Sequence, residues 1–134
     1  MKNRYLFISS IALTLFATSL SRAHHSVPGR YDYEAEITLT GMITRVDWIN
    51  PHVRILLDVT AEDGSVTTWE LASAPAQFMR RAGISKSKVM DDGGESVKVL
   101  GIRSRDPQLN HMWAYRITYG DGHFYQLSVP RPTS

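Results

Sequence analysis

The chain contains no cysteine. This absence excludes disulfide bonds, a lipid anchor on a processed cysteine and a thiol nucleophile, so the fold depends on its hydrophobic core alone. The sequence also lacks a G-x-S-x-G elbow, an H-E-x-x-H helix and a phosphate-binding glycine loop. The absence of these motifs favours a non-enzymatic role and leaves an enzyme of unknown type as the third functional hypothesis.

A short apolar stretch near the N-terminus is typical of a cleavable export signal. Lys2 and Arg4 precede the mostly apolar residues 5–20, and Ser21 and Ala23 place small side chains before a cut. The alternative is an uncleaved membrane anchor, but the stretch is short against the ~20 residues of a spanning helix. The signal region contains no twin arginines, which favours the general export route. Cleavage after Ala23 predicts a periplasmic or secreted bacterial protein.

Removal of residues 1–23 changes the charge of the chain. Lys2, Arg4 and Arg22 are lost, which leaves 12 basic and 13 acidic residues and a net charge of −1. A nearly neutral domain has no electrostatic reason to bind nucleic acid, and no membrane partner is expected after cleavage. The remaining 111 of 134 residues suffice for one hydrophobic core.

The mature chain divides into an N-terminal arm (24–36), one domain (37–130) and a short tail (131–134). Alternating apolar residues and turn signals predict six strands. They lie near residues 37–48, 53–59, 66–72, 97–102, 113–119 and 124–129. Gly41 lies where the buried parity of the first strand changes, which predicts a bulge or bend there.

One short helix is predicted at 76–82, with Ser73 as its N-cap and Gly83 at its end. Three strands, a helix between strands 3 and 4, and further strands are the order of an all-β, OB-type small barrel of five to six strands. A β-sandwich is the main competitor. It gives no reason for a single central helix.

Histidines provide the candidate site. After cleavage, His24 offers a free amine and an imidazole that chelate together, and His25 follows it. His52 ends Trp48-Ile49-Asn50-Pro51-His52 in the loop between strands 1 and 2, and His111 ends the loop between strands 4 and 5. Both loops flank the usual OB ligand face. Nitrogen ligands hold copper most strongly, with zinc and nickel behind it. An arm of about 12 residues spans up to ~40 Å, enough to reach either loop.

The histidine pair and His52 also have purely structural explanations. The histidine pair is equally explained by a loose chain end, and His52 by a turn residue whose ring bonds to backbone. For the carboxylates of Asp47, Asp58, Glu70 and Asp106, pairing across strands is one interpretation, and exposure to solvent, usual for isolated carboxylates on a sheet, is the favoured one. The second functional hypothesis is a binding or adaptor module that holds a small molecule or another exported protein on the barrel face.

The chain resembles a family of small secreted bacterial proteins classed as a domain of unknown function. The matching elements are Ala23-His24-His25-Ser26, Tyr31-Asp32, Leu39-Thr40-Gly41, Trp48-Ile49-Asn50-Pro51-His52, Arg80-Arg81-Ala82-Gly83, Val97-Lys98-Val99-Leu100-Gly101 and Asp121-Gly122. The sequence departs from that pattern at Val27-Pro28-Gly29, where an aromatic residue is expected, and in the loop 106–111, which lacks an Asp-Gly turn. The resemblance implies export and a fold, but no reaction.

Overall fold

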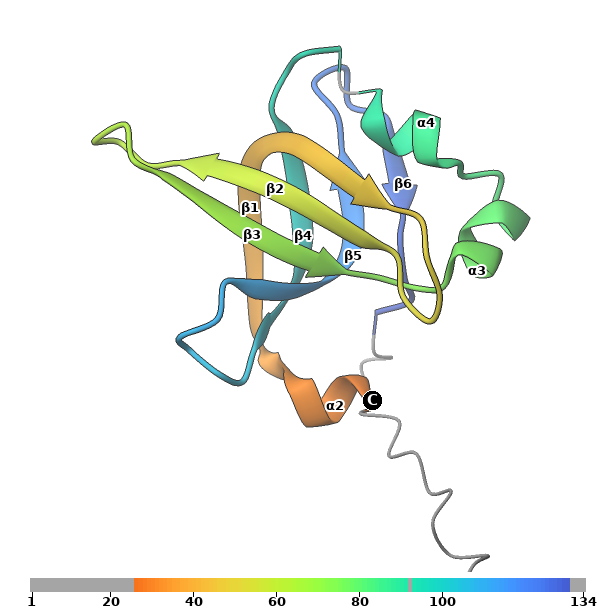
Figure 1. The fold of residues 1–134 in the computed structure, drawn as a ribbon, viewed down its shortest axis with the longest axis horizontal. Coiled ribbons are helices and arrows are strands. Elements are labelled where there is room, and N and C mark those ends of the chain that lie inside the picture. Colours follow the sequence, from red (N-terminus) through yellow and green to blue (C-terminus); the bar gives the residue numbers. More distant parts are fainter. Residues whose placement is uncertain (1–25, 92, 131–134) are drawn as a thin grey trace, which may run out of the picture.

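A computed structural model of the protein describes residues 26–91 and 93–130. These residues form six strands and three short helices (Figure 1). The strands are β1 (Tyr31–Asp47), β2 (Arg54–Thr60), β3 (Val66–Ala72), β4 (Val97–Ser104), β5 (His111–Thr118) and β6 (Phe124–Gln126). The helices are α2 (Val27–Arg30), α3 (Ala76–Arg81) and α4 (Lys86–Met90).

The strand pairings close the sheet into a ring. β1 pairs with both β2 and β4, β2 pairs with β3, and β4 pairs with β5, all antiparallel. Three residues of β3 (70–72) then pair in parallel with the first residues of β5, and β6 extends the sheet beside β5. The prediction of a mostly β fold with a helix between the third and fourth strands is confirmed.

The long first strand serves two neighbours in turn. Its first part pairs with β4 up to Gly41, and its second part pairs with β2 from Met42 onward. A Cβ atom on Gly41 would overlap the backbone carbonyl of Asp58 in β2. Only glycine lets the two backbones approach so closely. The pairing partner of β1 thus changes at Gly41, and Figure 1 shows β1 as a long, curved strand. The predicted bulge and change of buried parity lie farther along, because the register shifts between Ile43 and Arg45 and the buried positions pass from Ile43 to Val46.

Alternation along the strands places one face of each in the core. The largest fully buried side chains include Ile55, Leu57, Leu71, Met112 and Ile117. Met79 of α3 and Val89 of α4 join this cluster. A second, smaller cluster contains Tyr31, Ala72, Ile102, Trp113 and Tyr115, and Val27 of α2 packs against it. This second cluster supports the site described below.

Three sequence predictions require correction. β1 begins at Tyr31 rather than Ile37, so residues 31–36 belong to the sheet and not to an arm. Ser73 is not a helix cap, because its buried hydroxyl donates to the Val53 carbonyl (3.3 Å) and α3 begins only after Pro75. The connection after Gly83 contains a further helix, α4, whose first turn is capped by Ser85.

Within the described residues, no helix has the length and apolar character needed to cross a membrane.

Candidate functional site

His52 is held by two contacts at the end of the β1–β2 connection. Backbone bonds from Val53 to Ala74 and from Ser73 to Val53 draw this connection onto the end of β3. The His52 Nδ1 lies 3.1 Å from the Ser73 carbonyl oxygen. The Trp113 ring meets the His52 ring edge-on, with 5.1 Å between ring centroids. The imidazole is thus fixed by backbone and by packing.

These contacts determine the tautomer of His52. A carbonyl oxygen only accepts hydrogen bonds, so Nδ1 carries the proton and donates it to Ser73. The lone pair of the neutral ring then lies on Nε2. Metal-binding histidines commonly have this arrangement, in which the second ring nitrogen donates to a backbone carbonyl and orients the ligand. The alternative interpretation, in which His52 is a turn residue whose ring bonds to backbone, requires the same hydrogen bond.

A pocket of about 360 Å³ opens beside His52. Its wall includes Arg30, Tyr31, Ile49, Arg54 and Glu70. Burial raises the pKa of the Tyr31 phenol, the Arg30 charge lowers it and the Glu70 charge raises it further. The phenol therefore keeps its proton and offers a donor between a cation and an anion. The pocket combines an imidazole with charges of both signs.

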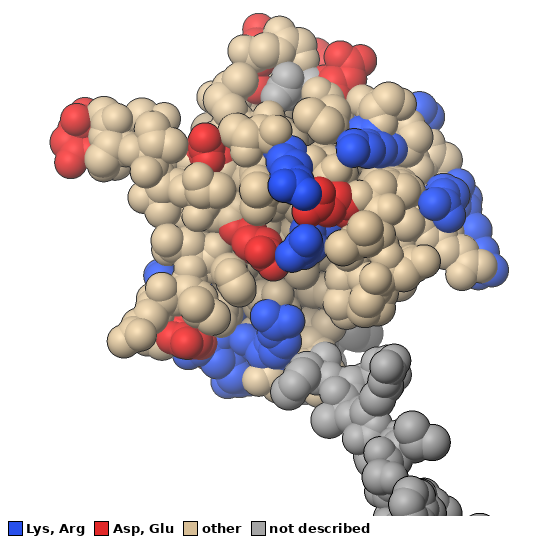
Figure 2. Space-filling model, viewed as in Figure 1, with Lys and Arg blue, Asp and Glu red and all other residues tan. Residues whose placement is uncertain are grey.

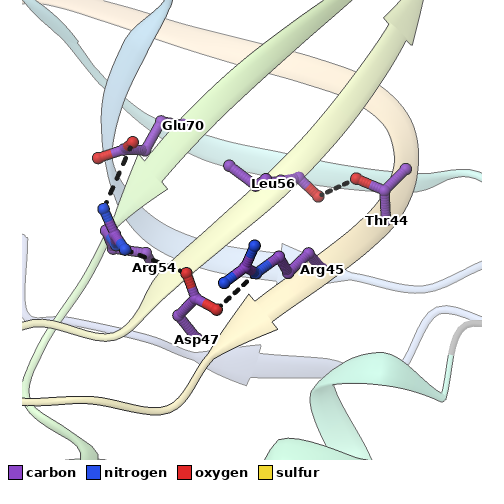
Figure 3. A network of polar contacts seen from close by, with 6 residues as sticks. All are labelled: Thr44, Arg45, Asp47, Arg54, Leu56 and Glu70. Atoms are coloured by element: carbon purple, nitrogen blue, oxygen red, sulfur yellow. Dashed lines mark hydrogen bonds and ion pairs between the residues drawn. The ribbon is translucent and has the colours of Figure 1, made fainter.

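Charged side chains run in alternating sign across β1, β2 and β3 beside this pocket (Figure 3). The Asp47 carboxylate accepts from Arg45 Nε at 2.7 Å and from Arg54 Nη2 at 3.1 Å. Arg54 also lies 3.9 Å from Glu70, a looser ion pair. Asp47 and Glu70 are therefore paired across strands rather than simply solvated. The sequence contains a signal for this pairing. Arg54 and Glu70 directly precede the buried Ile55 and Leu71, so alternation along each strand places both charged side chains on the opposite, outward face.

The Asp47 pairing predicts a pH-dependent contribution to stability. The hydrogen bond from Arg45 chiefly lowers the pKa of Asp47, burial opposes this, and the charges of Arg45 and Arg54 lower it further. A depressed folded-state pKa stabilises the protein above the ordinary pKa of aspartate, and this gain is lost as the pH falls through the folded-state pKa. We expect Asp47→Asn to destabilise the protein at about pH 7, and we expect the gap from wild type to narrow as the pH falls to about 3.

Urea unfolding at both pH values measures the difference. Glu62→Gln is the control, because it removes the same charge from the exposed β2–β3 turn. An equal gap between wild type and Asp47→Asn at both pH values contradicts the prediction.

His111 borders a different pocket. It pairs with Glu70 across β5 and β3, and both line a hollow of about 290 Å³ with Thr68, Leu109 and Asn110. Glu70 borders this hollow and the His52 pocket alike. The two histidines on the predicted ligand face thus lie on either side of Glu70.

A third hollow lies beside the β5–β6 turn. It measures about 300 Å³, and its wall includes Asp91, Glu95, Asp121 and His123. The His123 ring stacks on Tyr119 with 4.3 Å between centroids, and its Nδ1 bonds to Asp121. Across the described residues, no group of three or more His, Asp or Glu side chains is arranged to hold a metal ion. A metal bound to His52 would therefore need ligands from elsewhere in the chain.

His24 and His25 lie outside the described residues. The description begins at Ser26, and Val27 packs against the cluster that contains Trp113. Trp113 in turn contacts His52. The described chain therefore begins next to the layer of side chains that supports His52.

These features define a class, a small β-rich protein whose ring-like sheet has a mixed-charge pocket at the end where the described chain begins. The profile of one family, described as a family of unknown function (DUF6152), matches residues 13–112. The chain belongs to this family. No curated protein and no solved structure matches it.

Proposed function

We propose that this protein is an exported OB-type barrel that binds a late transition metal through His24, His25 and His52. Copper is the preferred ion, ahead of zinc and nickel, because imidazole and amine nitrogens hold it most strongly. The observation that carries the proposal is the orientation of His52. Its Nδ1–H is engaged by the Ser73 carbonyl, and this directs the lone pair to Nε2.

The barrel assignment rests on the strand order. A ring in which β1 pairs with β2 and β4, and β3 closes on β5 in parallel, suits a five-stranded OB barrel with β6 added. The β1–β2 and β4–β5 connections then flank the ligand face, and these connections carry His52 and His111. His111 is a weaker candidate ligand, because it lines the hollow on the far side of Glu70.

The chain start supplies the missing ligands in this proposal. Cleavage of the signal after Ala23 would leave His24 with a free amine three residues before Val27, which packs near Trp113. The amine and ring of His24, the His25 ring and His52 Nε2 then make up a nitrogen-rich set. Each must be neutral to bind, so metal affinity falls on acidification.

Copper titration of the exported protein tests the proposal. The purified protein must begin at His24, as verified by intact mass, because extra residues would remove the terminal amine. Calorimetry and paramagnetic resonance then follow Cu²⁺ binding. We expect His52→Ala to weaken binding at least about tenfold, the scale seen when one element of a metal site is removed. His24→Ala/His25→Ala should weaken it further.

His123→Ala is the matched control, since it removes one exposed imidazole near the β5–β6 turn. If His123→Ala weakens binding as much as His52→Ala, the copper is held nonspecifically. If the native-start protein binds no more tightly than the double variant, the metal proposal is wrong.

The alternative is a module that binds a small ligand or an exported partner without metal. The pocket beside His52 favours it, because Arg54 and Glu70 offer charges of both signs around a cavity of small-molecule size. A metal-free ligand would raise the melting temperature of chelator-treated protein, and Arg54→Gln would remove that increase. A metal-only site gives no such increase.

A further inference from the structure

The small net charge of the chain conceals a strong segregation of charge. Residues 71–90 carry four basic side chains and no acidic one. The rest of residues 24–134 carries eight basic and 13 acidic side chains, a net charge of −5. One segment of the domain is therefore strongly basic, and the remainder is acidic.

The basic segment forms α3 and α4, which lie together at one side of the molecule (Figure 1). Ala76, Met79 and Val89 bury the inner faces of these helices. The outward side chains form what we name the α3–α4 patch, which consists of Phe78, Arg80, Arg81, Lys86, Lys88 and Met90. In Figure 2, blue side chains gather on the side where these helices lie.

Apolar side chains accompany these cations. Phe78 is 38% exposed and Met90 is 37% exposed, although both lie on helices whose opposite faces are packed into the core. Lys88 donates to the Gly83 carbonyl at 2.7 Å, which holds its charge at the junction between the helices. The patch thus presents charges and apolar groups on a surface anchored to the barrel.

We propose that the α3–α4 patch docks on a membrane surface that contains anionic phospholipid. Cations attract phosphate headgroups, and exposed Phe and Met side chains can enter the boundary between headgroups and acyl chains. A polyanion such as DNA would use the cations but would gain nothing from burying Met90. The expectation of no membrane partner depended on cleavage of the apolar signal, and it did not consider how charge is distributed over the rest of the chain.

Vesicle sedimentation tests the proposal. The exported protein, with its start verified by mass, is mixed with vesicles of phosphatidylcholine alone or of phosphatidylcholine with phosphatidylglycerol. Each cation near an anionic surface contributes about 1 kcal/mol, which is roughly fivefold in binding. We expect preference for the anionic vesicles, decreasing with salt. Arg80→Gln/Arg81→Gln should reduce that preference roughly twenty-fivefold, and Phe78→Ser should weaken binding with less change in salt dependence.

Lys98→Gln/Arg116→Gln is the matched control, because it removes the same number of charges from β4 and β5. Circular dichroism verifies that each variant is folded. Equal binding to both vesicle types, or equal losses in the control and the patch variant, overturns the proposal. So does duplex DNA that binds as tightly as the vesicles and displaces them. The mass measurement must exclude uncleaved protein, because Lys2, Arg4 and Arg22 of an uncleaved leader would themselves favour anionic vesicles.

Discussion

Replacement of Gly41 by alanine is expected to lower the free energy of unfolding by about 3 kcal/mol, the upper end for an overpacked site. The added methyl would overlap the Asp58 carbonyl oxygen and lie 3.1 Å from Cγ of Leu57. Neither group can yield easily. Gly41 pairs with Val97 in β4, and the next residue, Met42, pairs with Asp58, so β1 is held on both sides.

Urea unfolding at neutral pH measures this effect as a lower midpoint with an unchanged slope. Gly29→Ala is the matched control, because its new methyl would meet only the Ser26 hydroxyl, at 3.5 Å. We expect a small change there. If both variants have the same stability, β1 and β2 can separate at Gly41 without cost, and the close approach is not what requires glycine.

The strands were predictable because their side-chain pattern is local. Ile55, Leu57 and Leu71 recur with period two and are fully buried, as alternation requires of a sheet with one core face. Gly41 was informative only in part, since β1 changes its pairing partner there, whereas the buried parity changes at the bulge between Ile43 and Arg45. The parallel contact between β3 and β5 depends on residues some 40 positions apart, and no local pattern specifies its register.

The corrected elements are those in which tertiary contacts decide local structure. Ser73 has the chemistry of a helix cap, but its hydroxyl and amide are used by Val53 instead. α4 has only five residues, and one buried side chain, Val89, anchors it. The first residues of β1 include Asp and Glu, so their sequence lacks the apolar alternation of a strand. Their aromatic members, Tyr31 above all, pack in the second cluster.

The candidate site was partly predictable from residue type. Imidazole chemistry and loop position singled out His52 and His111, and the structure places them beside separate pockets that share Glu70. The tautomer of His52 was not predictable, because it depends on the carbonyl of Ser73, 21 positions away. The role of Arg54 also depends on cross-strand register, which pairs it with Asp47.

Truncation of Leu71 is the second large effect, with an expected loss of about 3 kcal/mol in the free energy of unfolding. Leu71 is fully buried. It lies opposite Ile55 in β2 and Met112 in β5, at the contact that closes the ring. Leu71→Ala leaves a cavity between these two partners, and the paired backbones on both sides prevent the walls from collapsing into it.

Val66→Ala on the same strand provides the control, because Val66 is 58% exposed and lies outside the β3–β5 contact. Its expected change is within about 0.5 kcal/mol. Hydrogen exchange adds a second measurement. The Glu70 amide donates to the Asn110 carbonyl at this seam, and its protection should fall more in Leu71→Ala than in Val66→Ala. If the two variants unfold at the same urea concentration, packing at the β3–β5 seam contributes little to stability, and the ring is held mainly by its antiparallel pairs.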